Sequence, residues 1–182
     1  MRLFRVAHRA GPAWNLAKTL VQIVVVWGFA LGLLPWLAVA AEDASGVPRW
    51  QWPGRIPLGI VVFLLGSAVG IASAWLMATV GQGTPVPFDA ARELVVAGPY
   101  RYVRNPMAVS ATVQTTGVAL LYGSAATLVL AVGGGVLWHV VIRPGEERFL
   151  ADRFGDPYDA YRSAVRCWVP RRTRRGGEGG RG

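Results

Sequence analysis

Two groups of ionisable residues flank one long uncharged interval of the chain. The segment 98–106 carries two arginines and two tyrosines, in the order Gly98, Pro99, Tyr100, Arg101, Tyr102, Val103, Arg104, Asn105 and Pro106. The pair Glu146 and Glu147 follows the interval. Guanidinium groups bind anions, and carboxylates accept hydrogen bonds from hydroxyl or amino groups. The two groups therefore predict a pocket for a ligand that has both kinds of group. An interfacial salt bridge between Arg104 and Glu146, with the tyrosines as membrane anchors, is the open alternative.

Other kinds of site are not indicated by the sequence. Cys167 is the single cysteine, so neither an intrachain disulfide nor a thiolate metal cluster is expected. His8 and His139 are too few and too far apart to predict a metal site. The glycine-rich segment 81–87 has no Lys-Ser/Thr after it and contains two prolines, which predicts a rigid turn and not a phosphate-binding loop.

Composition indicates a membrane protein. With 182 residues the chain has room for one domain or a small helical bundle. Apolar residues make up 53% of it, yet its formal net charge is +9. The charges are clustered in blocks between long apolar intervals, as is typical of membrane proteins. Arginine-rich loops beside anionic lipid account for the basic charge, so no nucleic-acid partner is expected.

Two membrane spans are predicted over 19–41 and 56–80, which contain no charged residue. Each is longer than the roughly 20 residues that a helix needs to cross a bilayer. The second span carries small residues at helical spacing, namely Gly66, Ser67, Gly70, Ser73 and Ala74. These residues predict close packing against a neighbouring helix.

The uncharged interval 105–142 predicts a tight helical hairpin with its turn at 122–124. Two full spans and a turn need more than about 40 residues, so the hairpin is expected to be tilted or to cross incompletely. A separate short helix beginning at Glu146 and an amphipathic helix with Tyr158 and Tyr161 on one face are expected after it. Because the two arms return to the same side, the polar groups at their ends should meet.

The distribution of basic residues predicts the orientation. The segments 1–18, 81–104 and 143–182 hold all but two of the 19 Lys and Arg residues. The positive-inside rule therefore places these segments and both termini in the cytoplasm. The arginine-rich, lysine-poor composition is typical of a GC-rich bacterium, so the inner membrane is the expected location.

The polar segments resemble those of a known superfamily. The segment 98–106 resembles the Gly-Pro-Tyr-Arg-x-x-Arg-His-Pro signature of the isoprenylcysteine carboxyl methyltransferase and phospholipid methyltransferase superfamily. The downstream residues resemble the same superfamily in order and spacing: Glu146, Glu147, Leu150, Phe154, Gly155, Tyr158, Tyr161, Trp168, Val169 and Pro170. Together the two motifs cover roughly residues 81–171.

The resemblance implies an all-α, polytopic membrane enzyme with about four membrane helices, formed by two spans and the tight hairpin, and a short cytosolic helical cap. The uncharged intervals predict a two-span region over 1–80, and the arginine- and glycine-rich composition predicts a disordered basic tail over 171–182. The resemblance implies a methyltransferase core over 81–170. It also implies S-adenosylmethionine as cofactor and a lipophilic acceptor from the bilayer, either an isoprenylcysteine-like carboxylate or a lipid. The sequence does not indicate an oligomeric state.

The resemblance also implies roles for individual residues. Arg104, Glu146 and Glu147 would be catalytic. The cofactor pocket would be formed by Tyr102, Arg104, Asn105, Pro106, His139, Glu146, Glu147, Tyr158 and Tyr161. For His139, a packed interfacial histidine is the alternative.

Three positions depart from the superfamily pattern. Asn105 replaces its histidine, while Ala108 and Ser110 replace a tyrosine and a glycine. Asparagine does not act as a base near neutral pH, so Asn105 has no acid–base role. A carboxylate acceptor needs no base, whereas an amine acceptor would need Glu146 or Glu147. An NADPH-dependent membrane reductase and a non-enzymatic membrane accessory protein are the alternative functions.

Overall fold

A computed structural model describes residues 12–83 and 91–170. The described residues form helices and no strands: α1 (Pro12–Gln22), the π-helix η1 (Ile23–Leu33), α2 (Leu34–Ala44), α3 (Arg55–Thr79), the 3-10 helix η3 (Gly98–Arg101), α4 (Pro106–Tyr122), α5 (Ala125–Leu137), the π-helix η4 (Trp138–Ile142), α6 (Arg143–Phe154) and α7 (Asp156–Ala164). The predicted disorder of 171–182 and most of the predicted rigid turn lie outside the described residues.

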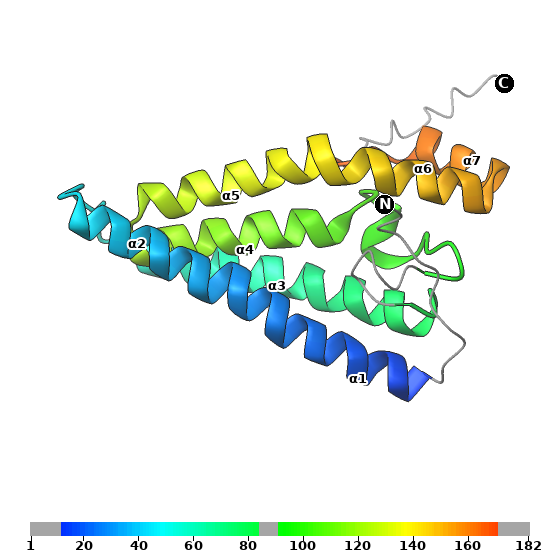
Figure 1. The fold of residues 1–182 in the computed structure, drawn as a ribbon, viewed down its shortest axis with the longest axis horizontal. Helices are drawn as coiled ribbons and strands as arrows, with labels where there is room; N and C mark the ends of the chain where they lie inside the picture. Colours follow the sequence, from blue (N-terminus) through cyan, green and yellow to red (C-terminus); the bar gives the residue numbers. More distant parts are fainter. Residues whose placement is uncertain (1–11, 84–90, 171–182) are drawn as a thin grey trace, which may run out of the picture.

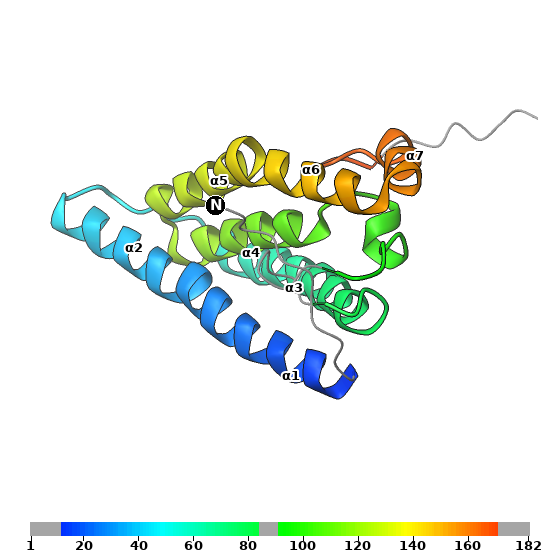
Figure 2. The ribbon, with the colours of Figure 1, turned by 45° about the vertical axis from the view of Figure 1, so that its right-hand side comes forward.

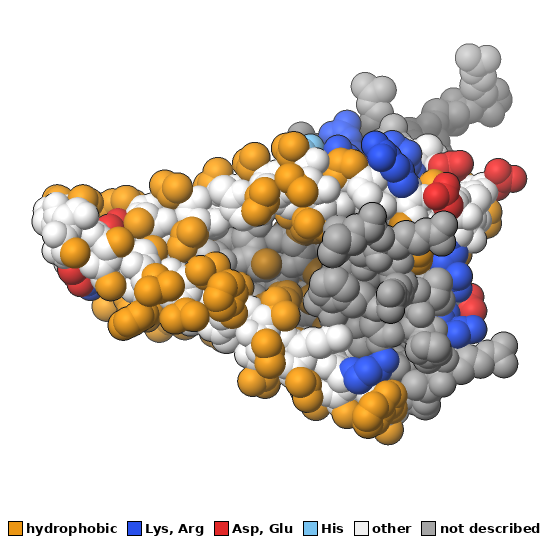
Figure 3. All heavy atoms as spheres, viewed as in Figure 1, with side chains coloured by type: hydrophobic (Ala, Val, Ile, Leu, Met, Phe, Trp, Pro, Cys, Tyr) orange, Lys and Arg blue, Asp and Glu red, His pale blue; other side chains and the backbone are white. Residues whose placement is uncertain are grey.

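Three helices among the described residues are long and apolar enough to cross a membrane: Leu16–Ala44, Arg55–Thr79 and Ala125–Phe154. α4 has 17 residues, or about 26 Å, which is a little less than the hydrocarbon core of roughly 30 Å. Hydrophobic side chains cover the middle of the molecule, and charged ones gather toward its two ends (Figure 3). The chain is an all-helical integral membrane protein, as the sequence predicts.

The long N-terminal helix crosses the bundle obliquely, while α3, α4 and α5 lie side by side (Figures 1 and 2). Both views place the loop between α2 and α3 at one end of the bundle. They place η3, α6 and α7 at the other end. We call these the loop end and the site end.

Two π-helical segments allow helices to continue through proline. A proline inside a helix clashes with the carbonyl group four residues earlier, which belongs to Leu31 for Pro35 and to Val140 for Pro144. Both carbonyls lie in π segments, η1 and η4, where the wider turn changes the hydrogen-bond register. The prediction of a separate helix starting at Glu146 is therefore wrong, because Ala125–Phe154 is one helix.

Small residues bring α3 and α4 into close contact, as their spacing predicts. Gly66, Gly70, Ser73 and Ala74 are buried in α3. A Cβ atom at Gly66 would lie 2.9 Å from Cγ of Gln114, and one at Gly117 would lie 2.8 Å from the backbone nitrogen of Phe63. Distances this short leave no room for a side chain, so glycine is required at this interface.

Gln114 links three helices through its side-chain amide. Its Oε1 accepts a hydrogen bond of 2.6 Å from Nε1 of Trp27 in η1. Its Nε2 donates one of 2.8 Å to Oγ of Ser67 in α3. One turn earlier, Oγ of Ser110 donates to the carbonyl oxygen of Gly66 at 2.8 Å. Such bonds supplement packing where no hydrophobic force drives helices together.

The hairpin turn lies where the sequence predicts it. Gly123 has a φ of 65° and ends α4 in the left-handed conformation, while Ser124 caps α5 by accepting from the backbone N–H of Thr127. The backbone N–H of Trp50 donates to the carbonyl of Gly123 at 2.8 Å. This contact fixes the α2–α3 loop on the hairpin.

Candidate functional site

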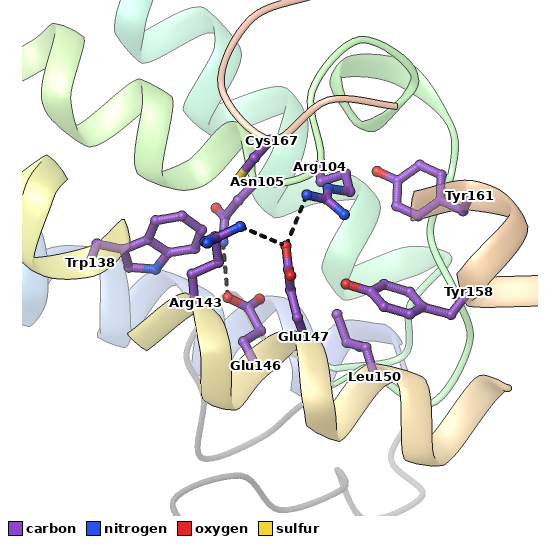
Figure 4. Close-up of a pocket in the computed structure, with 10 residues that line it drawn as sticks. All are labelled: Arg104, Asn105, Trp138, Arg143, Glu146, Glu147, Leu150, Tyr158, Tyr161 and Cys167. Atoms are coloured by element: carbon purple, nitrogen blue, oxygen red, sulfur yellow. Dashed lines mark hydrogen bonds and ion pairs between the residues drawn. The ribbon is translucent and has the colours of Figure 1, made fainter. Parts of the chain in front are cut away.

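A small pocket at the site end collects the polar residues that flank the hairpin. It is lined by Arg104, Asn105, Trp138, Arg143, Glu146, Glu147, Leu150, Tyr158, Tyr161 and Cys167. Figure 4 shows these side chains converging from the segment before α4, from η4, α6 and α7, and from the chain beyond α7. The cavity has a volume of about 30 Å³, which is room for a few water molecules at most.

Asn105 performs two tasks at the start of α4. Its Oδ1 accepts a hydrogen bond from the backbone N–H of Ala108 at 2.9 Å, which caps the helix. Its Nδ2 donates to Oε2 of Glu146 at 3.1 Å. Asparagine is among the best N-cap residues, so the departure from histidine gives a stronger cap and still orients the carboxylate.

Glu147 is neutralised by arginines from three segments. Its carboxylate lies 3.0 Å from Nη2 of Arg104, 3.5 Å from Nη1 of Arg143 and 3.6 Å from Nη2 of Arg162. Glu146 differs, because within the described residues it forms no ion pair and its hydrogen-bond partner is the neutral amide of Asn105. The adjacent carboxylates therefore have different electrostatic environments, and Glu146 remains available to a cation.

Within the described part of the chain, only one of the three guanidinium nitrogens of Arg104 is paired with a carboxylate. Its Nη2 binds Glu147, but its Nε and Nη1 are buried and have no hydrogen-bond partner among the described residues. Leaving a buried donor unpaired costs about 1–3 kcal/mol, and more when the group is charged. Unpaired guanidinium donors beside a pocket favour a ligand that brings an anionic or carbonyl oxygen.

Tyrosines form the wall between η3 and α7. Tyr158 is 1% exposed, and the hydroxyl of Tyr161 donates to the carbonyl oxygen of Tyr100 at 2.7 Å. Burial, and then the charge of Glu147, raise the pKa of Tyr158 to about 12. Burial also raises the pKa of Tyr161. Both hydroxyls are therefore protonated at neutral pH.

The chain beyond α7 returns across the pocket. The carbonyl oxygen of Arg166 accepts from the backbone N–H of Arg104 at 3.0 Å. Nε1 of Trp168 donates to Nδ1 of His139 at 2.8 Å, and its ring packs edge-on against Trp138. These contacts hold Cys167 against the pocket.

Six of the residues predicted for the site line the pocket: Arg104, Asn105, Glu146, Glu147, Tyr158 and Tyr161. Three others lie elsewhere. Tyr102 is 61% exposed, Pro106 is buried in the first turn of α4, and His139 binds Trp168.

Sequence reasoning missed four lining residues. Arg143 and Leu150 are one turn from the glutamates on the same helix, so helical spacing could have indicated them. Trp138 reaches the pocket from η4 and Cys167 from the returning chain. No local pattern indicates these two, because their positions depend on tertiary packing.

Fold and site together define an integral membrane protein with a charged pocket at one end of its helical bundle. The model of the phospholipid methyltransferase family matches residues 55–157, from the start of α3 into α7. The match covers more than half of the chain, which therefore belongs to this family. Its members are membrane methyltransferases, and S-adenosylmethionine is the general methyl donor of such enzymes. No curated protein sequence matches the chain.

The family match bears on the alternatives as well. It supports a methyltransferase over an NADPH-dependent reductase and over a non-enzymatic accessory protein. The matched region includes the 98–106 segment and both glutamates, but not the N-terminal helix. The methyl acceptor is left open by this membership.

Proposed function

We propose that the protein transfers the methyl group of S-adenosylmethionine to a lipophilic acceptor in the bilayer, at the pocket between Arg104 and Glu146. The observation that carries this proposal is that one pocket contains both a carboxylate without an ion pair and guanidinium donors without acceptors. Glu146 is a carboxylate without an ion pair among the described residues, and Arg104 has two buried nitrogens without partners.

The donor and acceptor groups of the pocket match the charged end of the cofactor. S-adenosylmethionine carries a carboxylate, an ammonium group and a positively charged sulfonium centre. Nε and Nη1 of Arg104 suit the carboxylate, and Glu146 suits a cationic group. Asn105 would orient Glu146, while Tyr158 would supply a neutral hydrogen-bond donor.

The volume of the pocket requires an opening step. Pockets for ligands of this size have volumes of about 300–1,000 Å³, about ten times the 30 Å³ present. The segment that returns across the pocket, 165–170, is the element that we infer to move. It is attached by contacts such as Arg104 to Arg166 and Trp168 to His139, which can break and re-form.

The cofactor supplies an activated methyl group, so the protein's task is to orient the reactants and exclude water. Leu150 and Trp138 provide apolar lining for this. For a carboxylate acceptor, such as an isoprenylcysteine-like group, no base is needed. For an amine acceptor such as a lipid head group, Glu146 would be the base, because three arginines stabilise the charge of Glu147. We further propose that the site end faces the cytoplasm of a bacterial inner membrane.

Calorimetric titration of the purified protein with S-adenosylmethionine and S-adenosylhomocysteine tests the site. The second ligand lacks the methyl group and the positive charge on sulfur, but it keeps the ammonium group. We expect Glu146 to accept from the ammonium group, so Glu146→Gln should weaken binding of both ligands about tenfold or more, since a hydrogen bond to a charged group contributes about 1.5–3 kcal/mol. Asp152→Asn, an exposed carboxylate on the same helix, is the matched control. Absence of binding by the wild type, which the accessory-protein alternative predicts, contradicts the proposal.

The acceptor class is tested with methyl-labelled cofactor and lipid extracts. A carboxyl methyl ester releases volatile labelled methanol on alkaline hydrolysis, whereas an N-methylated head group keeps its label. Label in the lipid fraction identifies the acceptor by mass spectrometry. Label confined to water-soluble products would contradict a lipophilic acceptor.

A further inference from the structure

A second cavity lies inside the membrane region, away from the site. It has a volume of about 540 Å³ and is lined by Trp27, Gly28, Leu31, Gly32, Phe63, Val118, Leu121 and Tyr122. These residues belong to the N-terminal helix, α3 and α4. We call this cavity the membrane groove.

Two glycines of the membrane groove differ from those of the α3–α4 interface. A Cβ atom at Gly28 or Gly32 would meet nothing within 4 Å. Small residues in membrane helices usually allow backbones to approach, as Gly66 and Gly117 do here. Gly28 and Gly32 instead leave space open, so they create a cavity where the other glycines create contact.

The groove is continuous with the lipid-facing surface. Val24 and Phe29 on the same helix and Leu64 on α3 are 72%, 53% and 59% exposed. They lie within membrane-spanning helices, where hydrocarbon chains and not water surround the protein. An apolar cavity open to this surface is filled from the bilayer.

Size and position select the occupant. The volume lies within the range of about 300–1,000 Å³ typical of single-ligand pockets. The cavity is only slightly larger than one turn of helix, which fills roughly 420 Å³ as a cylinder 5.4 Å long and 10 Å wide. It is therefore too small for a partner helix. Tyr122, at the loop end of α4, lines the groove. Asn105 of the site lies 13 residues before Val118 on α4, or about 20 Å away.

We propose that the membrane groove binds one hydrocarbon chain of a phospholipid from the leaflet at the loop end. This lipid differs from the methyl acceptor, whose reacting group must reach the opposite end of the bundle. The bound chain fills the space beside the hydrogen bond from Trp27 to Gln114. It thereby supports the N-terminal helix where that helix diverges from α3 and α4.

Filling the groove tests the proposal. The double variant Gly28→Leu/Gly32→Leu places side chains in the open space, and leucine favours a helix more than glycine does, so folding should be preserved. The matched control is Gly133→Leu/Gly134→Leu. A Cβ atom at either of these α5 glycines also meets nothing within 4 Å, but neither residue lines the groove.

Each protein is reconstituted in dioleoyl phosphatidylcholine vesicles, extracted in detergent and measured by native mass spectrometry. The wild type and the α5 control should retain one phosphatidylcholine per chain, and the groove variant should lose it. Equal retention by all three, or none by the wild type, overturns the proposal. A wild-type dimer that becomes a monomer in the groove variant also overturns it, because a second copy would then fill the groove. Cofactor binding is measured separately and should be the same in all three.

Discussion

The charged residues that contact the hairpin turn and the arginine and glutamates of the pocket are paired in different ways. At the loop end, Glu42 and Arg55 bind the backbone: Oε1 of Glu42 accepts from the N–H of Ala126 at 2.7 Å, and Arg55 donates to the carbonyls of Leu120 and Leu121. A carboxylate thus lies at a helix N-terminus and a guanidinium group at a C-terminus, where the helix dipole favours each.

At the site end, charged side chains bind one another, and some of the guanidinium donors remain without an acceptor. Arg104 shares Glu147 with two other arginines and keeps two buried nitrogens unpaired. One oxygen of Glu42 is also unpaired, but its partner oxygen already caps α5. Backbone-bound charges therefore stabilise the bundle at one end, whereas we propose that the partly paired charges at the other end bind the cofactor. Four predictions test this contrast.

Gly123→Ala should produce the largest effect, and only on stability. The left-handed conformation costs an alanine about 1–2 kcal/mol, and the new Cβ would collide with the carbonyl oxygen of Trp50, which adds about 1–3 kcal/mol. Unfolding in mixed micelles with increasing denaturing detergent measures the loss. Cofactor affinity of the folded fraction should not change; a large drop in that affinity would mean that the two ends are coupled.

Arg104→Lys keeps the positive charge at the site end but removes the planar guanidinium group and its Nε and Nη donors. We expect cofactor affinity to fall about 10- to 100-fold, because a hydrogen bond to a charged group contributes about 1.5–3 kcal/mol. Arg55→Lys is the matched change at the loop end and should lower stability without altering affinity. Equal affinities for the two variants, measured by calorimetry, would remove the contrast between the ends.

Glu42→Gln retains an oxygen that accepts from Ala126 but loses the charge at the start of α5. The expected loss of stability is about 0.3–1 kcal/mol, the usual contribution of a charge at a helix end. Glu42→Leu leaves the N–H unpaired and should cost more, about 1–3 kcal/mol. If both variants are as stable as the wild type, the capping role assigned to Glu42 is wrong.

Cys167 provides the smallest test. Burial raises the pKa of its thiol, although the nearby charge of Arg104 acts in the opposite direction. The reactive thiolate should therefore form at higher pH than in an unperturbed cysteine, whose pKa is about 8.5. Alkylation by iodoacetamide, followed by mass spectrometry from pH 7 to pH 10, should be slow at pH 8. A midpoint below pH 8.5 would contradict the partly buried position of Cys167.

Sequence reasoning predicted the features that depend on local pattern. The turn at Gly123 and the small-residue face containing Gly66 and Gly70 follow from residue type and spacing, and both are present. The continuation of the helix past Pro144 could not be predicted in this way. Proline normally ends a helix, and a π segment becomes visible only when the backbone is known.

The site was predicted only in part, because some of its features depend on contacts between segments and not on local pattern. The resemblance named Asn105 for its position. Its cap on α4 is a local contact with Ala108, but its bond to Glu146 depends on how two helices meet. The different environments of Glu146 and Glu147 likewise arise from Arg104 and Arg162, which are distant from them in sequence. Adjacent, identical residues cannot be distinguished without those contacts.

The π segment Trp138–Ile142 sets the rotation of the α6 side chains about the helix axis relative to those of α5. A π turn is equivalent to one extra residue in an α-helix, and one residue corresponds to a rotation of about 100°. Without that residue, the lipid-facing surface of α5 would be unchanged, but both glutamates would rotate away from Arg104 and Asn105. One helix can thus present an apolar surface to the bilayer along α5 and its glutamates to the pocket along α6. Substitutions on one of these surfaces need not affect the other.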